Sequence, residues 1–400
     1  MATKLDGETL ALLSDSVAKT SMAGANEVDA IGRMVAAHAT DVVRADYVTA
    51  MTGRNLTDGN STSATPSGSS FLNPGYEIRA DDAEARAVGT VLGSIESPAA
   101  AERALSALAA DPAKLDAVTA SAIGRSQVGY ANGNLDTLTH DPTIASRVAT
   151  TAASVSDPAL KAQVFGSIAR SSREMGEGAP LTVESGPDRA AANATLARSL
   201  TTLVRSDTNG IVDELQANRS AFDGAEMASY AELALAAGQG GSLGQVLSDL
   251  QLGNDGTGDP ARRFYGDQLD GNPVTNGSPE AANLGYFVGS VYSGAAALKA
   301  DSEAAVQGVE TMLDVAATLA GAAPHPAVGT SAGLAKTLIG EAMSSGADDV
   351  AAANRVEAET LDRAAVPHGP DGRVPVQGSA GESAYNAQVE RVTRLVETSR

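Results

Sequence analysis

Apolar residues recur along much of this chain at the spacing of one helix face. The pattern is clearest in 28–48, 196–203 and 385–396, where Val, Leu and Tyr return every three or four residues. This period is typical of amphipathic helices, and no segment shows the strict alternation of a half-buried strand. We therefore predict an all-α protein, built as a multi-helix bundle or as irregular stacked helix pairs, with little or no β structure.

Two stretches of similar sequence, 97–126 and 141–172, indicate paired helices. Each opens with Ser-Pro or Asp-Pro, carries an arginine six positions later (Arg103 and Arg147), and contains a second Asp-Pro. A Ser or Asp side chain can accept hydrogen bonds from the free amides in the first turn of a helix. Proline is favoured at the first helical position, because the N–H that it lacks would have no partner within the helix. Two helices per unit is usual for helical repeats. A solenoid and an irregular bundle both remain open.

Changes in composition suggest where the chain divides. We predict N-terminal helices within 1–75 that end in a Gly-, Ser- and Thr-rich loop at 52–76, a helical domain at 76–237, a Gly-, Asn- and Asp-rich connector at 238–280, and a C-terminal helical domain at 281–400. The last domain would contain an apolar hairpin at 301–345 and an amphipathic terminal helix at 382–398.

The longest apolar passage, residues 312–343, lies in that hairpin. Pro-His-Pro at 324–326 predicts a turn, and the helix before it has an acidic face opposite its apolar one. Such a one-sided helix is typical of a soluble core, so we predict a buried hairpin. Insertion into a membrane under suitable conditions is the alternative, because glycines in the second helix also permit close packing in lipid. These glycines are Gly329, Gly333 and Gly340.

The same passage contains "GTSAG" around Ser331, which matches G-x-S-x-G. It resembles the nucleophile turn of patatin-like lipases and, more loosely, of α/β-hydrolases. The resemblance implies a serine hydrolase, with Asp362 (or Asp348) and His368 completing the order Ser, Asp, His. That turn needs a strand before it and an oxyanion loop upstream. The preceding "AAPHPAV" is too short and broken for a strand, so catalysis is the weakest alternative.

A second polar stretch, "DPARRFYGDQLDG", is a candidate interaction site. Arginine and aromatic residues are enriched at the energetic centres of protein interfaces. The competing interpretation is a loop that the aromatic rings anchor onto the helices while the charges stay solvated. The residues concerned are Arg262, Arg263, Phe264, Tyr265, Asp267 and Asp270.

Charge and composition exclude several functions. The net charge of −21 argues against broad binding of nucleic acid and favours solubility or a basic partner. The absence of cysteine removes disulfides and zinc–thiolate sites. The four histidines lack metal-site spacing, the glycine-rich segment 253–280 lacks calcium ligands in register, and "GQGGSLG" follows a helix instead of a strand. We therefore predict no metal and no cofactor.

The phrase "GSPEAANLGYFVGSVYSGAAALKADSEAAV" (277–306), followed by the Ala- and Gly-rich hairpin, resembles helical regions of large bacterial secreted toxins and injected effectors. The resemblance has no diagnostic motif and carries over no site residue. It implies a protein made in the bacterial cytoplasm and exported without a signal peptide, since the first twenty residues do not form one. The predicted function is a non-enzymatic helical interaction or delivery module that binds a protein partner. A pore-forming toxin and a serine hydrolase are the alternatives.

Overall fold

The computed structural model describes residues 5–20, 24–54, 56, 80–123, 128–131, 134–137, 142–178, 187–218, 222, 224–252, 279–298, 307–309 and 311–312. Helices dominate these residues, so the all-α prediction is confirmed. The chain divides into two compact units, 1–203 and 204–400, and the division falls within the last turn of α9 (Pro187–Arg205). The finer domain boundaries predicted above stay a prediction.

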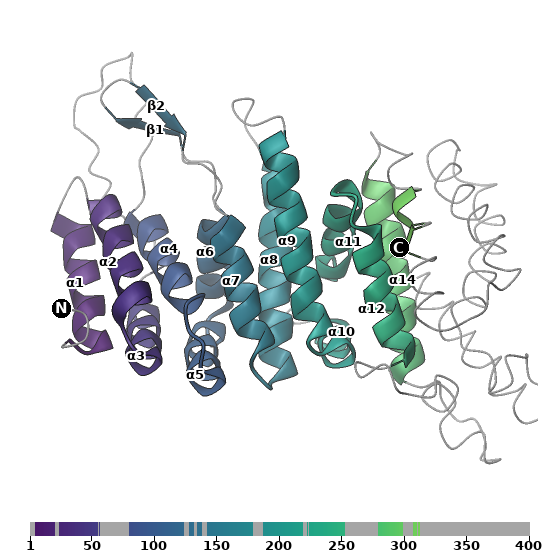
Figure 1. Ribbon diagram of the computed structural model, residues 1–400, viewed down its shortest axis with the longest axis horizontal. Coiled ribbons are helices and arrows are strands. Elements are labelled where there is room, and N and C mark those ends of the chain that lie inside the picture. The colour runs from purple at the N-terminus through teal and green to yellow at the C-terminus, as the bar shows by residue number, and fades with distance from the viewer. Residues whose placement is uncertain are drawn as a thin grey trace, which may run out of the picture. The chain divides into compact units, whose positions relative to one another are not determined.

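The first unit is a stack of helix pairs. Helices α1, α3, α5 and α7 each contact the next of that series, and α2, α4, α6 and α8 form a second series in the same way. In Figure 1, α3 and α5 are seen nearly end-on below α2, α4 and α6. The bounds are α1 (Gly7–Thr20), α2 (Gly24–His38), α3 (Asp41–Thr52), α4 (Ala80–Leu92), α5 (Pro98–Ala109), α6 (Pro112–Ile123), α7 (Pro142–Ala153) and α8 (Pro158–Gly178).

The two similar stretches of sequence form the pairs α5–α6 and α7–α8, and local chemistry sets where these helices begin. Asp111 Oδ1 accepts a hydrogen bond from Ala113 N at 3.2 Å, and Asp157 Oδ1 accepts one from Ala159 N at 2.9 Å. Both aspartates thus cap a helix that starts with proline, as predicted. Ser97 differs, because its side chain makes no capping bond although Pro98 follows it.

Small residues bring successive helices of the stack together. A Cβ added at Gly32 of α2 would lie 2.8 Å from the Cβ of Ala87 on α4. One added at Gly93, just after α4, would lie 2.7 Å from the Cβ of Arg147 on α7. Contacts this short leave no room for a side chain, so glycine fixes the spacing of the helices at both places.

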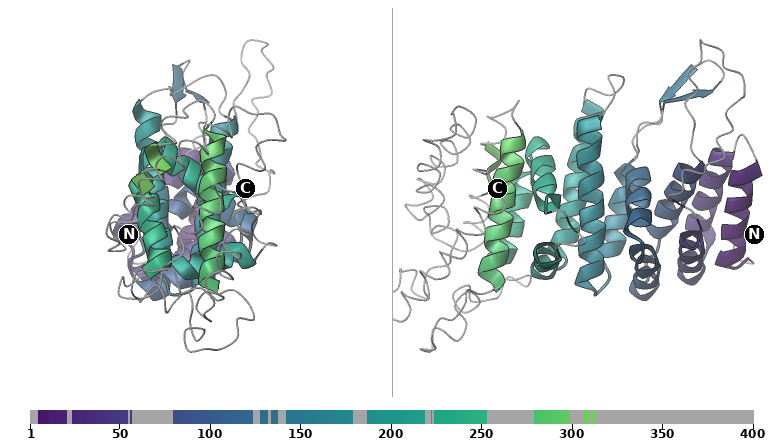
Figure 2. Two further views of the ribbon diagram at one scale, coloured as in Figure 1. Left: turned by 90° about the vertical axis from the view of Figure 1, so that its right-hand side faces the viewer. Right: turned by 180° about the vertical axis from the view of Figure 1, so that it is seen from behind.

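A short antiparallel ribbon interrupts the helices between α6 and α7. It consists of β1 (Val128–Ala131) and β2 (Asn134–Thr137), with Val128 opposite Thr137 and Ala131 opposite Asn134. Figure 2 shows it in the view from behind, outside the row of helices. It is the only β structure in the described part of the chain, in keeping with the predicted little or no β.

The second unit packs several helices around one that is buried almost all round. Helix α14 contacts α10, α11 and α12, and its residues Tyr286, Phe287 and Val291 are buried. Gly294 permits the approach to α11, since a Cβ there would lie 2.6 Å from Glu232 N. The bounds are α10 (Thr208–Ala217), α11 (Glu226–Ala236), α12 (Gly240–Leu252) and α14 (Pro279–Ala297).

The beginning of the predicted apolar hairpin is part of this second unit and packs against α11 and α12. Residues 307–309 and 311–312 have helical backbone, and Thr311 Oγ1 donates to Gln307 O at 2.7 Å. Val309 and Met312 are buried. Gly308 lies against Gly240 at the start of α12, so the two backbones touch directly. The rest of 301–345 lies outside the described residues. Among the residues that the structure describes, no helix is long and apolar enough to cross a membrane.

Candidate functional site

The site residues predicted from the sequence all lie outside the described part of the chain. They stay predictions, and the structure neither brings them together nor separates them. They are the interaction candidates Arg262, Arg263, Phe264, Tyr265, Asp267 and Asp270, the hydrolase candidates Ser331, Asp362 and His368, and the hairpin glycines Gly329, Gly333 and Gly340. The polar chemistry that the structure does describe is concentrated where helix pairs meet.

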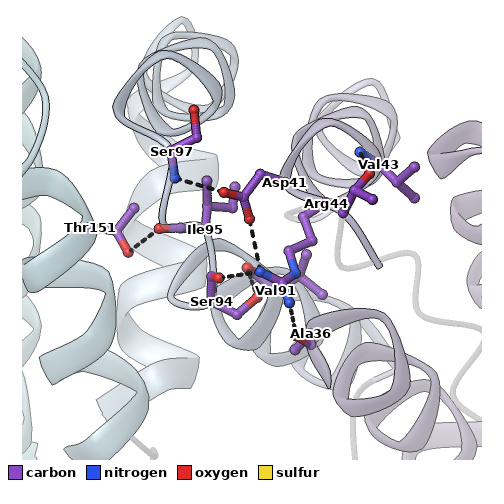
Figure 3. A network of polar contacts seen from close by, with 10 residues as sticks. Ala36, Asp41, Val43, Arg44, Val91, Ser94, Ile95, Ser97 and Thr151 are labelled. Carbon is purple, nitrogen blue, oxygen red and sulfur yellow. Dashed lines mark hydrogen bonds and ion pairs between the residues drawn. The ribbon is translucent and has the colours of Figure 1, made fainter. Parts of the chain in front are cut away.

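The densest cluster is a junction network centred on Arg44 and Asp41 in the first turn of α3 (Figure 3). Arg44 Nη1 donates to Asp41 Oδ1 at 2.8 Å and to Ser94 O at 2.6 Å, while its Nη2 donates to Ala36 O at 2.6 Å. Asp41 Oδ2 accepts from Ser97 N at 2.7 Å. One ion pair therefore connects the ends of α2 and α4 to the start of α5.

The electrostatics of this network follow from helix geometry. Ala36 lies in the last turn of α2, and Ser94 follows the end of α4, where carbonyl groups lack partners and the helix dipole is negative. The guanidinium of Arg44 neutralises both ends, and its side chain is only 14% exposed. The negative carboxylate of Asp41 accepts the hydrogen bond of Ser97 N–H, which lies at the positive end of the α5 dipole. The network is complementary to three helix ends at once.

A related contact uses one of the two arginines that mark the sequence repeat. Arg103 Nη2 on α5 donates to Val42 O at 3.1 Å and to Asp46 Oδ1 at 2.7 Å, both on α3. Arg103 therefore connects the α5–α6 pair to α3, although its side chain is 50% exposed. Arg44 lies four residues after its N-cap, Thr40, instead of six, so the repeat did not reveal it.

A second cluster joins α6 to α8. Asp116 Oδ1 accepts from Ser167 Oγ at 2.5 Å and from Arg170 Nη2 at 2.8 Å. Thr119 Oγ1 lies 2.7 Å from Ser167 Oγ and 3.3 Å from Ser171 Oγ. Because Ser167 and Thr119 are buried, no substrate atom can reach the hydroxyl that the carboxylate orients. This cluster fixes the register of the two helices.

A buried phenol lies between α1 and α3. Tyr47 Oη is 3.0 Å from Ser14 Oγ, and Ser14 Oγ also donates to Leu10 O at 3.2 Å. Burial raises the pKa of Tyr47 to about 12, against the hydrogen bond with Ser14, which lowers it. A phenol held neutral in this way is suited to packing and cannot act as a base near neutral pH.

The second unit uses its polar groups similarly. Arg205 Nε donates to Asp249 Oδ2 at 2.7 Å, and its Nη1 donates to Gln245 Oε1 at 2.9 Å, which ties the end of α9 to α12. Asn283 Nδ2 on α14 donates to Asn209 O at 3.4 Å. These bonds again join one helix to another.

Taken together, the described polar groups act as connectors between helices. No group of three or more His, Cys, Asp or Glu side chains placed to hold a metal occurs among the described residues. Several cations of the first unit, such as Arg44, Lys114 and Arg170, bond to groups on neighbouring helices, whereas Arg33 and Arg147 are exposed. Exposed carboxylates include Glu8, Glu27, Glu96 and, in the second unit, Asp213. The described surface therefore presents charges of both signs, on a chain whose net charge is −21.

Comparisons of the chain with protein families, with curated proteins and with solved structures give no significant match.

Proposed function

We propose that this protein is a non-enzymatic helical interaction module that binds a basic protein partner, as part of a bacterial secreted effector or toxin. The observation that carries the proposal is the net charge of −21, from 49 Asp and Glu against 28 Lys and Arg. Some of the cations, such as Arg44 and Lys114, bond to other helices, while Glu27 and Glu96 are on the surface. The excess of carboxylates favours a basic partner.

The stacked pairs of the first unit support this proposal. A stack of helix pairs presents long, continuous surfaces made by equivalent faces of successive helices, which suits it to bind extended segments of another protein. Its polar clusters are buried or bonded between helices, as Ser167 and Asp116 illustrate, and they rigidify the surface without exposing a reactive group. Complementary charge on a binding face raises the rate of association and the specificity more than the affinity.

The direct test measures binding of the full chain to labelled peptides of equal length that are basic, neutral or acidic. We expect saturable binding of basic peptides only, weakened when the salt concentration rises because exposed charges are screened. A variant with Glu8, Glu27 and Glu96 each replaced by Gln should bind less tightly. Its matched control replaces each of the three by Asp, which keeps the charge. Equal affinity for all three peptide classes would refute the proposal.

Two further assays address the alternative functions. Dye release from liposomes at neutral and mildly acidic pH tests membrane insertion of 301–345, with Gly333→Glu as the variant that should abolish it. Labelling by a fluorophosphonate probe, with Ser331→Ala as control, tests the hydrolase. Leakage or specific labelling would replace the proposed function by the corresponding alternative.

A further inference from the structure

The outer face of α1 differs from the rest of the described surface. Among the described residues, three large apolar side chains are exposed: Leu12 at 51%, Leu13 at 44% and Val42 at 60%. Two of the three are neighbours on α1. Thr9 and Ser16, one helical turn to either side, are exposed and uncharged. The outer face of α1, defined by these four residues, is an uncharged stripe on an acidic protein.

The packing of the first unit explains why this face stands alone. Helix α3 lies between α1 and α5, and α4 lies between α2 and α6, so each is covered on both sides. Helix α1 packs through Gly7, Leu10 and Ser14, which are buried, and lies at the edge of the unit in both Figure 1 and Figure 2. An outermost repeat of a helical stack ordinarily presents a polar outer face to water. The outer face of α1 presents leucines instead.

The charge of the chain identifies the molecule that this face suits. A basic partner gains most from surfaces with exposed carboxylates and nothing from an uncharged stripe. Two copies of a chain with net charge −21 repel each other wherever carboxylates face carboxylates. They repel least where an uncharged apolar face meets its own equivalent. Two-fold pairing of one face with itself is also the commonest arrangement of protein dimers.

We propose that the outer face of α1 pairs with the same face of a second copy, which brings the two leucines of each copy together. A single helix per subunit provides less area than a standard interface, so the dimer is weak and forms reversibly. The dependence on salt distinguishes it from binding of a basic partner. Screening weakens attraction between opposite charges but also weakens repulsion between like charges. Self-association should therefore strengthen as salt rises.

Sedimentation equilibrium of the full chain tests this, from about 1 µM to about 300 µM, where small interfaces associate. Sodium chloride is varied so that the Debye length falls from about 13 Å to about 4 Å. We expect the average mass to rise towards that of a dimer with concentration and with salt. The double variant Leu12→Glu, Leu13→Glu should raise the dissociation constant at least about 100-fold, from the apolar area that it removes and the charge that it adds.

Val42→Glu is the matched control, because Val42 is even more exposed than the two leucines but lies on α3. Far-UV circular dichroism confirms that all variants keep their helices. Dimerisation that survives Val42→Glu and is lost in the double variant supports the proposal. A monomer at every concentration and salt overturns it, and so does a dimer that the two leucine substitutions leave intact. Neither result depends on whether basic peptides bind.

Discussion

Replacing Arg44 by Ala is the most direct test of the junction network. The substitution removes three hydrogen bonds, to Asp41, Ser94 O and Ala36 O. Removing a partner from a buried charge-assisted network typically costs 3–5 kcal/mol, or roughly 1.5–3 kcal/mol for each bond to a charged group. Arg44 Nε is buried without a hydrogen-bond partner among the described residues, and this unpaired donor offsets part of what the three bonds contribute. We therefore expect a loss of about 2–4 kcal/mol.

Urea unfolding followed by circular dichroism measures that loss. Amide hydrogen exchange locates it, because the N–H of Ser97 depends on Asp41, which Arg44 holds in place. Arg103→Ala is the matched control: it also removes bonds to a carbonyl group and a carboxylate on a neighbouring helix, but its side chain is 50% exposed. Exposed ion pairs contribute about 0–1 kcal/mol. If the two variants lose the same stability, the network does not hold the helix ends together, and our reasoning is wrong.

Three further outcomes follow from single residues. Gly32→Ala should lower the free energy of unfolding by about 1–3 kcal/mol, because the added Cβ would lie 2.8 Å from the Cβ of Ala87. Gly53→Ala should change it little, because the nearest atom to its added Cβ lies at 3.4 Å. Equal melting temperatures of the two variants would contradict this. Gly238→Ala should cost about 1 kcal/mol from its φ of 66° alone, since no atom crowds it, and thermal unfolding checks this value. Burial raises the pKa of Tyr47 to about 12, from about 10 in the unfolded chain. The free energy of unfolding should therefore not depend on Tyr47 titration below pH 10, and it should fall by up to about 2–3 kcal/mol between pH 10 and 12. The Tyr47→Phe variant should not show this loss of stability at alkaline pH. If the unfolding midpoints of the two proteins fall equally between pH 10 and 12, the pKa of Tyr47 is not raised.

The elements of the fold could be predicted because their signals are local. Asp111 and Asp157 precede prolines, and the amides that they cap lie within the next two residues, so the sequence alone specifies these helix starts. The contact of Gly32 with Ala87 could not be predicted in the same way. A glycine within a helix weakens that helix, and only the neighbouring helix gives the reason for its presence.

The junction network shows a similar limit. Ser97 was expected to cap α5 with its own side chain, yet Asp41 accepts the hydrogen bond from its N–H. The two residues are far apart in the sequence, and no periodic pattern relates them. Arg103 could be singled out because it repeats, whereas Arg44 has no counterpart at the same offset from a helix start. Contacts that occur once in a stack leave no repeated signal.

The separation of structural from surface carboxylates leads to a final prediction. Asp111, Asp157 and Asp207 accept hydrogen bonds from backbone amides at helix starts, so their charge stabilises the fold. Glu27 and Glu96 are exposed, so their charge is available to a partner. Asp→Ala at a cap should cost about 1 kcal/mol each in urea unfolding. Glu→Gln on the surface should cost less than about 0.5 kcal/mol and instead weaken binding of basic peptides. If the glutamate variants unfold more readily and bind unchanged, the acidic character of this chain serves its fold, and the partner must be sought on another surface.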